Sequence, residues 1–113
     1  MVGPENTAAA VGSGDLDVLG TPVLLAWCEE ATCAALDLEE HQTSVGTRVE
    51  IEHLVASSVG STVTTHAEVI ARDGRMVTFR VTATDEAGTL VGTGEVRRVI
   101  VDRDRFLDRL RKG

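Results

Sequence analysis

One helix-forming stretch followed by a long strand-forming stretch is the feature that most limits how this chain can fold. Residues 23–36, VLLAWCEEATCAAL, are rich in strong helix formers. From residue 44 to residue 102, apolar and polar residues alternate with the period of two that is typical of β-strands. A single long helix before several antiparallel strands must lie on one face of a curved sheet. The sequence therefore predicts the α+β class.

The expected boundaries fit one domain. A chain of 113 residues leaves little room for a second domain, and a core of this size gains stability from burial against a second copy. Within the single domain, residues 1–113, we expect four parts. They are an irregular lead-in (1–14), a central helix (20–37), antiparallel strands (44–102) and a short helix (103–112).

Local signals refine two of these parts. Thr21 is expected to cap the central helix, since its hydroxyl suits an N-cap and Pro22 suits the first helical position. Asp73 and Gly74 predict a tight hairpin between two strands. We expect the strands to form a four-stranded antiparallel meander with the central helix packed on it. That arrangement is the hotdog fold.

The charge distribution excludes some partners. The net charge is −7, with −9 in residues 1–53, −2 in residues 54–96 and +4 in residues 97–113. Such an acidic chain lacks the basic face that supplies most of the affinity for nucleic acid. The basic C-terminal segment either meets phosphates of a small ligand or only complements the dipole of a helix end.

Neither a membrane segment nor a disulfide is expected. No apolar run approaches the ~20 residues that a membrane-spanning helix needs, and residues 1–14 lack the features of a secretory signal. Cys28 and Cys33 lie five positions apart in the central helix and cannot pair comfortably with each other. Unpaired thiols are typical of a reducing compartment, so we expect a cytoplasmic protein.

Several kinds of active site are absent from the sequence. Ser13, in VGSGD, lacks the spacing of a G-x-S-x-G nucleophile elbow. Gly92 and Gly94 fall in strand sequence, where they favour either a β-bulge or a close approach of two backbones, and they open no helix that could bind phosphate. Two cysteines and three scattered histidines form no metal-ligand cluster. We expect neither a metal nor a bound cofactor.

Three segments of the chain are similar to those of a known family. They read GTPVLLAWCEEA, TSVGTRVEIEHL and GTGEVRRVIVDRDRF. In order and spacing they resemble the fluoroacetyl-CoA thioesterase-like family of hotdog proteins, over about residues 15–110. The resemblance implies hydrolysis of an acyl thioester, such as an acyl-CoA, by a homodimer or a tetramer built from dimers.

The resemblance also implies which residues act. The family's catalytic set matches Thr21, Glu29 and His53, and its substrate-binding residues match Gly46 and Arg98. We hypothesise that Glu29 and His53 form an acid/base pair. Thr21 either hydrogen-bonds within this pair or is itself the nucleophile. The backbone N–H of Gly46 is expected to bind the thioester oxygen, at a site that includes residues of both subunits.

Each of these residues also has another interpretation. Glu29 also fits an ordinary solvated helix acid, with Glu30 as its rival for the catalytic role, and His53 also fits a buried core histidine. Gly46 also fits a simple strand irregularity. Arg98 either pairs with an acid or contacts a phosphate of coenzyme A. For the whole protein, the main alternative is a non-catalytic hotdog protein that binds acyl-CoA or another small ligand. A hotdog hydratase and a purely structural dimer are further alternatives.

Two features depart from the family pattern. Family members usually begin with a strand before the central helix, and the lead-in leaves little sequence for it. This departure bears on the shape of the acyl pocket. In addition, Val96 stands where relatives often have a His beside the Arg of the last strand.

Overall fold

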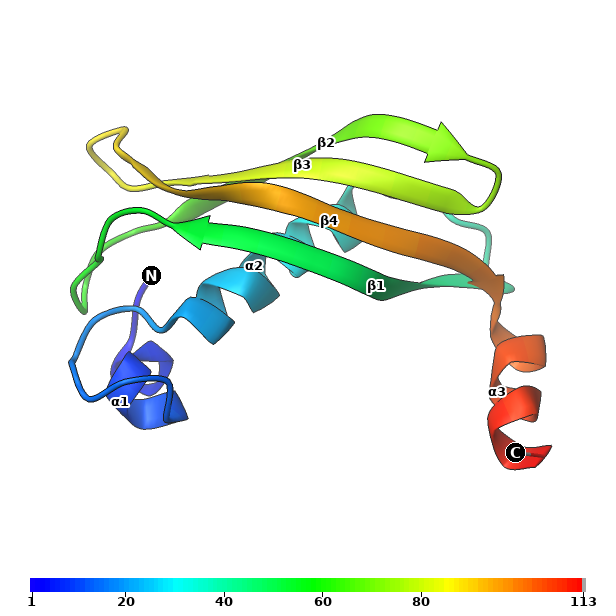
Figure 1. Ribbon diagram of the computed structural model, residues 1–113, viewed down its shortest axis with the longest axis horizontal. Coiled ribbons are helices and arrows are strands. Elements are labelled where there is room, and N and C mark those ends of the chain that lie inside the picture. The colour runs from blue at the N-terminus through cyan, green and yellow to red at the C-terminus, as the bar shows by residue number, and fades with distance from the viewer. Residues whose placement is uncertain (113) are drawn as a thin grey trace.

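The computed structural model describes residues 1–112, which form eight elements of secondary structure (Figure 1). In chain order they are the 3-10 turn η1 (Pro4–Asn6), helices α1 (Ala8–Val11) and α2 (Thr21–Ala34), strands β1 (Gln42–His53), β2 (Thr64–Asp73), β3 (Met76–Thr84) and β4 (Leu90–Asp102), and helix α3 (Arg103–Lys112). One long helix, four antiparallel strands and a short terminal helix agree with the predicted α+β class.

The central helix has a different cap from the one predicted. Gly20, in an extended conformation, is the N-cap, and Thr21 is the first helical residue. The carbonyl of Gly20 already accepts hydrogen bonds from the amides of Val23 and Leu24, at 3.0 and 3.1 Å. The prediction of Thr21 as the N-cap is therefore wrong. Its hydroxyl is not needed for capping and is available to another partner.

The four strands form one antiparallel sheet in the order β1-β4-β3-β2. Strands β2, β3 and β4 form a meander, and Gly74, at φ +59°, lies in the tight turn between the first two. β1 does not continue this meander but pairs with β4 along its whole length, from Gln42 to His53. The prediction of a four-stranded meander is wrong here because residues 54–63 carry the chain from one edge of the sheet to the other. β1 and β2 are therefore the two edge strands.

Helix α2 covers one face of this sheet (Figure 1). Leu24, Cys28 and Thr32, spaced by four residues, are buried against the strands. The sheet side of the core consists of Val77, Phe79, Val81, Ala83, Val91, Val96 and Ile100. A Cβ on Gly92 would lie 2.9 Å from the Leu24 side chain, and one on Gly94 would clash with the backbone of β1. The close approach predicted at these two glycines is confirmed.

Within residues 1–112, no strand precedes α2. Val2 instead exchanges backbone hydrogen bonds of 2.8 Å with Ser61 and Gly60, just before β2 begins. The lead-in also contains α1, a single turn whose cap is the Thr7 side chain, which accepts from the Ala10 amide at 3.1 Å. None of the helices described here is both long and apolar enough to cross a membrane.

Candidate active site

Thr21 and His53 meet where α2 begins and β1 ends. Thr21 Oγ1 lies 2.8 Å from His53 Nδ1, a hydrogen-bond distance between residues 32 positions apart in the chain. The contact follows from the fold, because β1 runs antiparallel to α2 and ends beside its first residue (Figure 1). The pair borders a pocket of about 260 Å³. The other lining residues are Ala8, Ser13, Val18, Leu19, Leu54, Val55 and Ala56.

The surroundings of His53 favour its neutral form. Burial lowers the pKa of the imidazole below its ordinary value of 6.5, and the backbone of Val55 opposes this shift only in part. The second ring nitrogen, Nε2, is buried and has no hydrogen-bond partner among residues 1–112. When Nδ1 accepts the hydroxyl hydrogen of Thr21, Nε2 carries the N–H of the ring. His53 Nδ1 is then the acceptor in this contact, and the N–H of Nε2 has no acceptor among residues 1–112.

A second group of polar side chains lies further along α2 and β1. Arg98 of β4 is only 8% exposed and places its Nη1 3.3 Å from Glu29 Oε2. Its Nε donates to Ser44 Oγ at 2.9 Å, and its Nη2 donates to the Ser44 carbonyl at 3.2 Å. These three contacts fix the guanidinium and, through it, the Glu29 carboxylate.

Gly46 makes this ion pair possible. A Cβ at this position would lie 2.6 Å from Glu29 Oε2 and 3.4 Å from Arg98 Nη1. The register of β1 against β4 also shifts between Gly46 and Arg48, which marks a β-bulge. Bulges often re-aim side chains next to active sites. Glycine is needed here because a carboxylate approaches the backbone closely.

The two groups lie apart within one chain. Thr21 and Glu29 are eight positions apart on α2, which is about 12 Å along the helix axis. Gly46 and His53 are seven positions apart on β1, which is roughly 20 Å along the strand. Within residues 1–112 the Glu29 carboxylate pairs with Arg98 and forms no hydrogen bond with His53. The structure brings Thr21 to His53, and Glu29 to Gly46 and Arg98, but among residues 1–112 no contact joins these two groups, which lie at different positions along α2 and β1.

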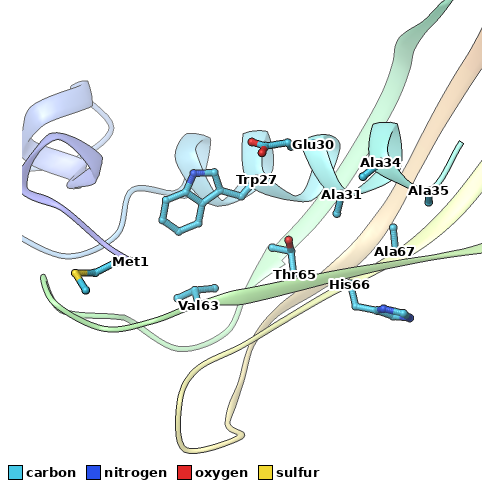
Figure 2. A pocket seen from close by; sticks show the side chains of 10 residues that line it. All are labelled: Met1, Trp27, Glu30, Ala31, Ala34, Ala35, Val63, Thr65, His66 and Ala67. Atoms are coloured by element: carbon cyan, nitrogen blue, oxygen red, sulfur yellow. The ribbon is translucent and has the colours of Figure 1, made fainter.

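The other acid and histidine candidates lie elsewhere. Glu30 lines an open groove of about 570 Å³ between α2 and β2, on the side of α2 away from Gly46. Figure 2 shows this groove, with Trp27 on its helix wall and His66 pointing away from the helix. Val96, at the family's His position, is fully buried in the core.

Ser44 is the site residue that the sequence analysis missed. It uses both its hydroxyl and its carbonyl to hold Arg98. Its position two residues before Gly46 in β1 was the available signal, because residues two apart on a strand share a face. Among residues 1–112, no group of three or more metal-ligating side chains gathers.

Comparison with known proteins places this geometry in a family. The sequence model of the family described as fluoroacetyl-CoA-specific thioesterase matches residues 2–104. The fluoroacetyl-CoA thioesterase of Streptantibioticus cattleyicolor is 30% identical over 98 residues, which make up 85% of this chain and 70% of that protein.

Solved structures agree with this result. A structure of the fluoroacetyl-CoA thioesterase has a TM-score of 0.88 at 27% identity, covering 98% of this chain and 87% of that one. A thioesterase superfamily member from Thermus thermophilus has a TM-score of 0.92 at 29% identity, with coverages of 99% and 84%. A hot-dog-like protein from Thermanaerovibrio acidaminovorans has a TM-score of 0.88 at 27% identity, with coverages of 98% and 83%. The predicted hotdog fold is confirmed, and the chain belongs to the fluoroacetyl-CoA-specific thioesterase family as an enzyme of the thioester hydrolase class.

Proposed function

We propose that this chain hydrolyses an acyl-CoA, or a related acyl thioester, at a site that two copies of the chain build together. The observation that carries the proposal is the buried, unpartnered Nε2 of His53, beside the hydrogen bond to Thr21. Membership of a thioesterase family supports the reaction class. The separation of Glu29 from this pair supports a two-copy site, because each group alone holds only part of what hydrolysis needs.

A second copy can unite the two groups through β1. This strand is an edge of the sheet, so one row of its backbone groups is open to pairing. In an antiparallel pair of identical strands, the start of one lies beside the end of the other. Gly46 lies near the start of β1 and His53 ends it. Pairing therefore brings the Glu29 group of one copy towards the Thr21–His53 pair of the other, whereas β2 carries none of these residues.

In this arrangement, Glu29 of the partner subunit accepts the N–H of His53 Nε2 and orients the ring. Thr21 then provides the hydroxyl, His53 the base and Glu29 of the partner subunit the carboxylate that orients the base. Arg98 holds the Glu29 carboxylate in place. The backbone N–H of Gly46 donates to the thioester oxygen as negative charge develops on it.

Two routes fit these roles. In the first, Thr21 Oγ1 attacks the thioester carbon, its proton passes to His53 Nδ1, and the C–S bond breaks as that proton moves to sulfur. Water then hydrolyses the acyl-threonine. In the second, Thr21 positions a water molecule whose oxygen attacks the thioester carbon while His53 takes one of its protons. The C–S bond then breaks, His53 delivers this proton to the thiolate sulfur, and the carboxylic acid is released.

The proposal also covers the cofactors, the oligomeric state and the cellular location of the enzyme. Neither route uses a metal or a bound cofactor, and coenzyme A enters as part of the substrate. The assembly is a homodimer, and light scattering would distinguish it from a tetramer of paired dimers. We place the protein in the cytoplasm, since Cys28 and Cys33 are both free thiols.

Thiol release from a panel of acyl-CoAs, fluoroacetyl-CoA included, tests the reaction. We expect hydrolysis by the wild type and a loss of about 10²-fold or more in kcat/KM for His53→Ala and for Glu29→Ala. Glu30→Ala is the matched control and keeps the wild-type activity. Binding of intact acyl-CoA without hydrolysis of any member of the panel would favour the non-catalytic alternative.

A mixed dimer tests whether the site spans two copies. Chains carrying His53→Ala and Glu29→Ala are given different tags, and the mixed dimer is isolated through both tags. If His53 works with Glu29 of the partner subunit, one of the two sites is intact and about half of the wild-type activity returns. If both residues act within one chain, the mixed dimer stays inactive.

A further inference from the structure

Helix α3 carries an apolar stripe that residues 1–112 of its own chain leave uncovered. The helix follows β4 directly, and Asp102 Oδ1 accepts a hydrogen bond from the Arg105 amide at its start. Figure 1 shows α3 projecting from the end of the sheet, on the same side as α2. Leu107 and Leu110 lie three positions apart on one face of α3 and are 41% and 65% exposed. We call these two residues the leucine stripe.

A second set of exposed apolar residues lies at the opposite end of the molecule, on the last residue of α1, the connection from α1 to α2 and the connection after β1 (Figure 1). The two connections are joined where the Leu19 amide donates to the Ser57 carbonyl and Val18 bridges Ser58. This lead-in patch consists of Val11 (43% exposed), Leu16 (65%), Leu54 (49%), Val55 (40%) and Val59 (44%). Leu54 and Val55 also line the pocket beside Thr21 and His53. The patch is therefore continuous with one wall of that pocket.

The register of the sheet brings the stripe and the patch together when two copies pair through β1. Gln42, the first residue of β1, pairs with Asp102, so α3 begins just beyond the start of β1. Leu54 and Val55 follow directly after its end. In an antiparallel β1 pair, the region beyond the start of one strand lies beside the region beyond the end of the other.

We propose that α3 of each copy packs its leucine stripe on the lead-in patch of the partner and so completes the wall of the partner's pocket. This contact rests on the β1 dimer proposed above. It adds a role for the C-terminal helix, which contains none of the proposed catalytic residues. Each copy then shapes the acyl end of the site that contains the Thr21–His53 pair of the other copy.

Charge supports a second copy as the occupant. Residues 103–112 carry a net charge of +3, and residues 1–20 carry −3 with no Lys or Arg. On the patch, Leu16 stands between Asp15 and Asp17, and all three are exposed. On α3, Leu110 stands between two exposed arginines, Arg109 and Arg111. An apolar residue flanked by acids on one surface therefore has its counterpart, flanked by bases, on the other.

Disulfide trapping in the full-length Cys33→Ser protein separates this contact from the β1 dimer itself. Cys28 is buried and stays in place. Thr47→Cys, Arg48→Cys and Glu50→Cys, made singly near the middle of β1, report pairing through this strand when a covalent dimer forms under mild oxidation. The thiol-release assay on each reduced protein reports hydrolysis independently.

A second set reports the α3 contact. Leu110→Cys is combined with Val55→Cys or with Leu16→Cys, and the matched control combines it with Val69→Cys on the opposite edge strand, where Val69 is 49% exposed. We expect covalent dimers from the first two combinations and none from the control. Trapping through β1 without trapping through Leu110 would overturn the α3 contact and leave the dimer standing. Absence of both would overturn the dimer and the contact, whether or not the protein hydrolyses thioesters.

Kinetics give a second readout. Replacing the stripe by Leu107→Asp with Leu110→Asp should raise KM about tenfold for acyl-CoAs and leave kcat within about twofold, since the stripe borders the substrate and not the reacting atoms. The variant should still trap through β1. Arg109→Glu with Arg111→Glu should weaken trapping through Leu110, and Asp15→Arg with Asp17→Arg in the same chain should restore it. An unchanged KM, or no rescue by the exchanged charges, would contradict the proposal.

Discussion

The two ends of β1 differ in how they hold their polar groups. At the end of the strand, His53 and Thr21 are joined by one hydrogen bond between neutral groups, beside a largely apolar pocket. Near its start, Glu29 and Arg98 form a charged pair that Ser44 braces through two further contacts. The first end suits a group that must gain and lose a proton, and the second suits charges that must stay fixed.

In the roles proposed above, the two ends of β1 have different functions: one holds the base, His53, and the other holds the orienting carboxylate, Glu29. A base works best when its environment leaves it neutral, as burial does for His53. An orienting carboxylate works best when a fixed partner holds it in place, as Arg98 does for Glu29 at 3.3 Å. The four predictions below test this division.

Removing the Thr21 hydroxyl should have the largest effect, and only on catalysis. Thr21→Val should lower kcat about 100-fold or more, because the hydroxyl that contacts His53 Nδ1 is lost. Since Gly20 is the N-cap, the unfolding midpoint in urea should change little. Thr21→Ser, which keeps the hydroxyl, should retain most of the activity. A marked loss of stability in Thr21→Val would return this residue to a structural role.

Breaking the charged end should cost stability as well as activity. Arg98→Leu removes the contacts to Glu29 and Ser44 and should lower the free energy of unfolding by about 2 kcal/mol. The control is Arg48→Leu, which breaks the exposed 3.4 Å pair with Glu50 and should cost less than about 0.5 kcal/mol. If urea denaturation gave the same loss of unfolding free energy for Arg98→Leu and Arg48→Leu, the buried Arg98–Glu29 pair would stabilise the fold no more than the exposed Arg48–Glu50 pair.

Adding a methyl group at Gly46 should test whether the Glu29 carboxylate is the group that lies against the backbone of β1 at this position. Gly46→Ala places a Cβ 2.6 Å from Glu29 Oε2, so the carboxylate must move away from Arg98, at a cost of about 1 kcal/mol. In a Glu29→Ala background the same change should cost much less, because the obstructing carboxylate is gone. A double-mutant cycle on unfolding free energies measures this coupling. Additive costs would show that the methyl group meets something else.

The smallest effect should be the pH dependence contributed by His53. Its pKa is lower in the folded chain than in the unfolded one, so the unfolded chain binds a proton first as the pH falls through about 6.5. His53 therefore reduces stability at acid pH, and this loss disappears as the pH rises above the unfolded value. His53→Gln should flatten the difference in unfolding free energy between about pH 8 and about pH 5. This sign applies to the chain by itself, and the opposite sign in the assembled protein would mean that a carboxylate, as proposed for Glu29 of the partner subunit, faces His53 there.

Much of the fold could be predicted because its signals are local. The helix formers of α2, the Asp73–Gly74 turn and the close approach at Gly92 and Gly94 each depend on a few neighbouring residues. The partner of β1 could not be predicted in this way. Alternation shows that a stretch forms a strand, but it does not show which edge of the sheet that strand joins.

The site divides in the same manner. The family resemblance proposed Glu29, Gly46 and Arg98, and the structure brings these three together across as many as 69 positions. Ser44 was missed because its only signal was its position two residues before Gly46, which places it on the same face of the strand but does not show what it contacts. The cap at Gly20 was missed because Thr21 and Gly20 both suit an N-cap, and only the backbone decides between them.

The pairing of β1 with β4 also governs when the site comes into existence. β2, β3 and β4 are joined by short turns, whereas β1 must find β4 across a long intervening segment, with Gln42 opposite Asp102. Contacts so distant in sequence are entropically the hardest to close and form late in folding. When β1 detaches from β4, strands β2, β3 and β4 still form a three-stranded meander. Gly46 and His53 both lie on β1, so both are lost from the site at once. Activity is therefore a sensitive reporter of β1 docking, and it should disappear before the rest of the sheet unfolds.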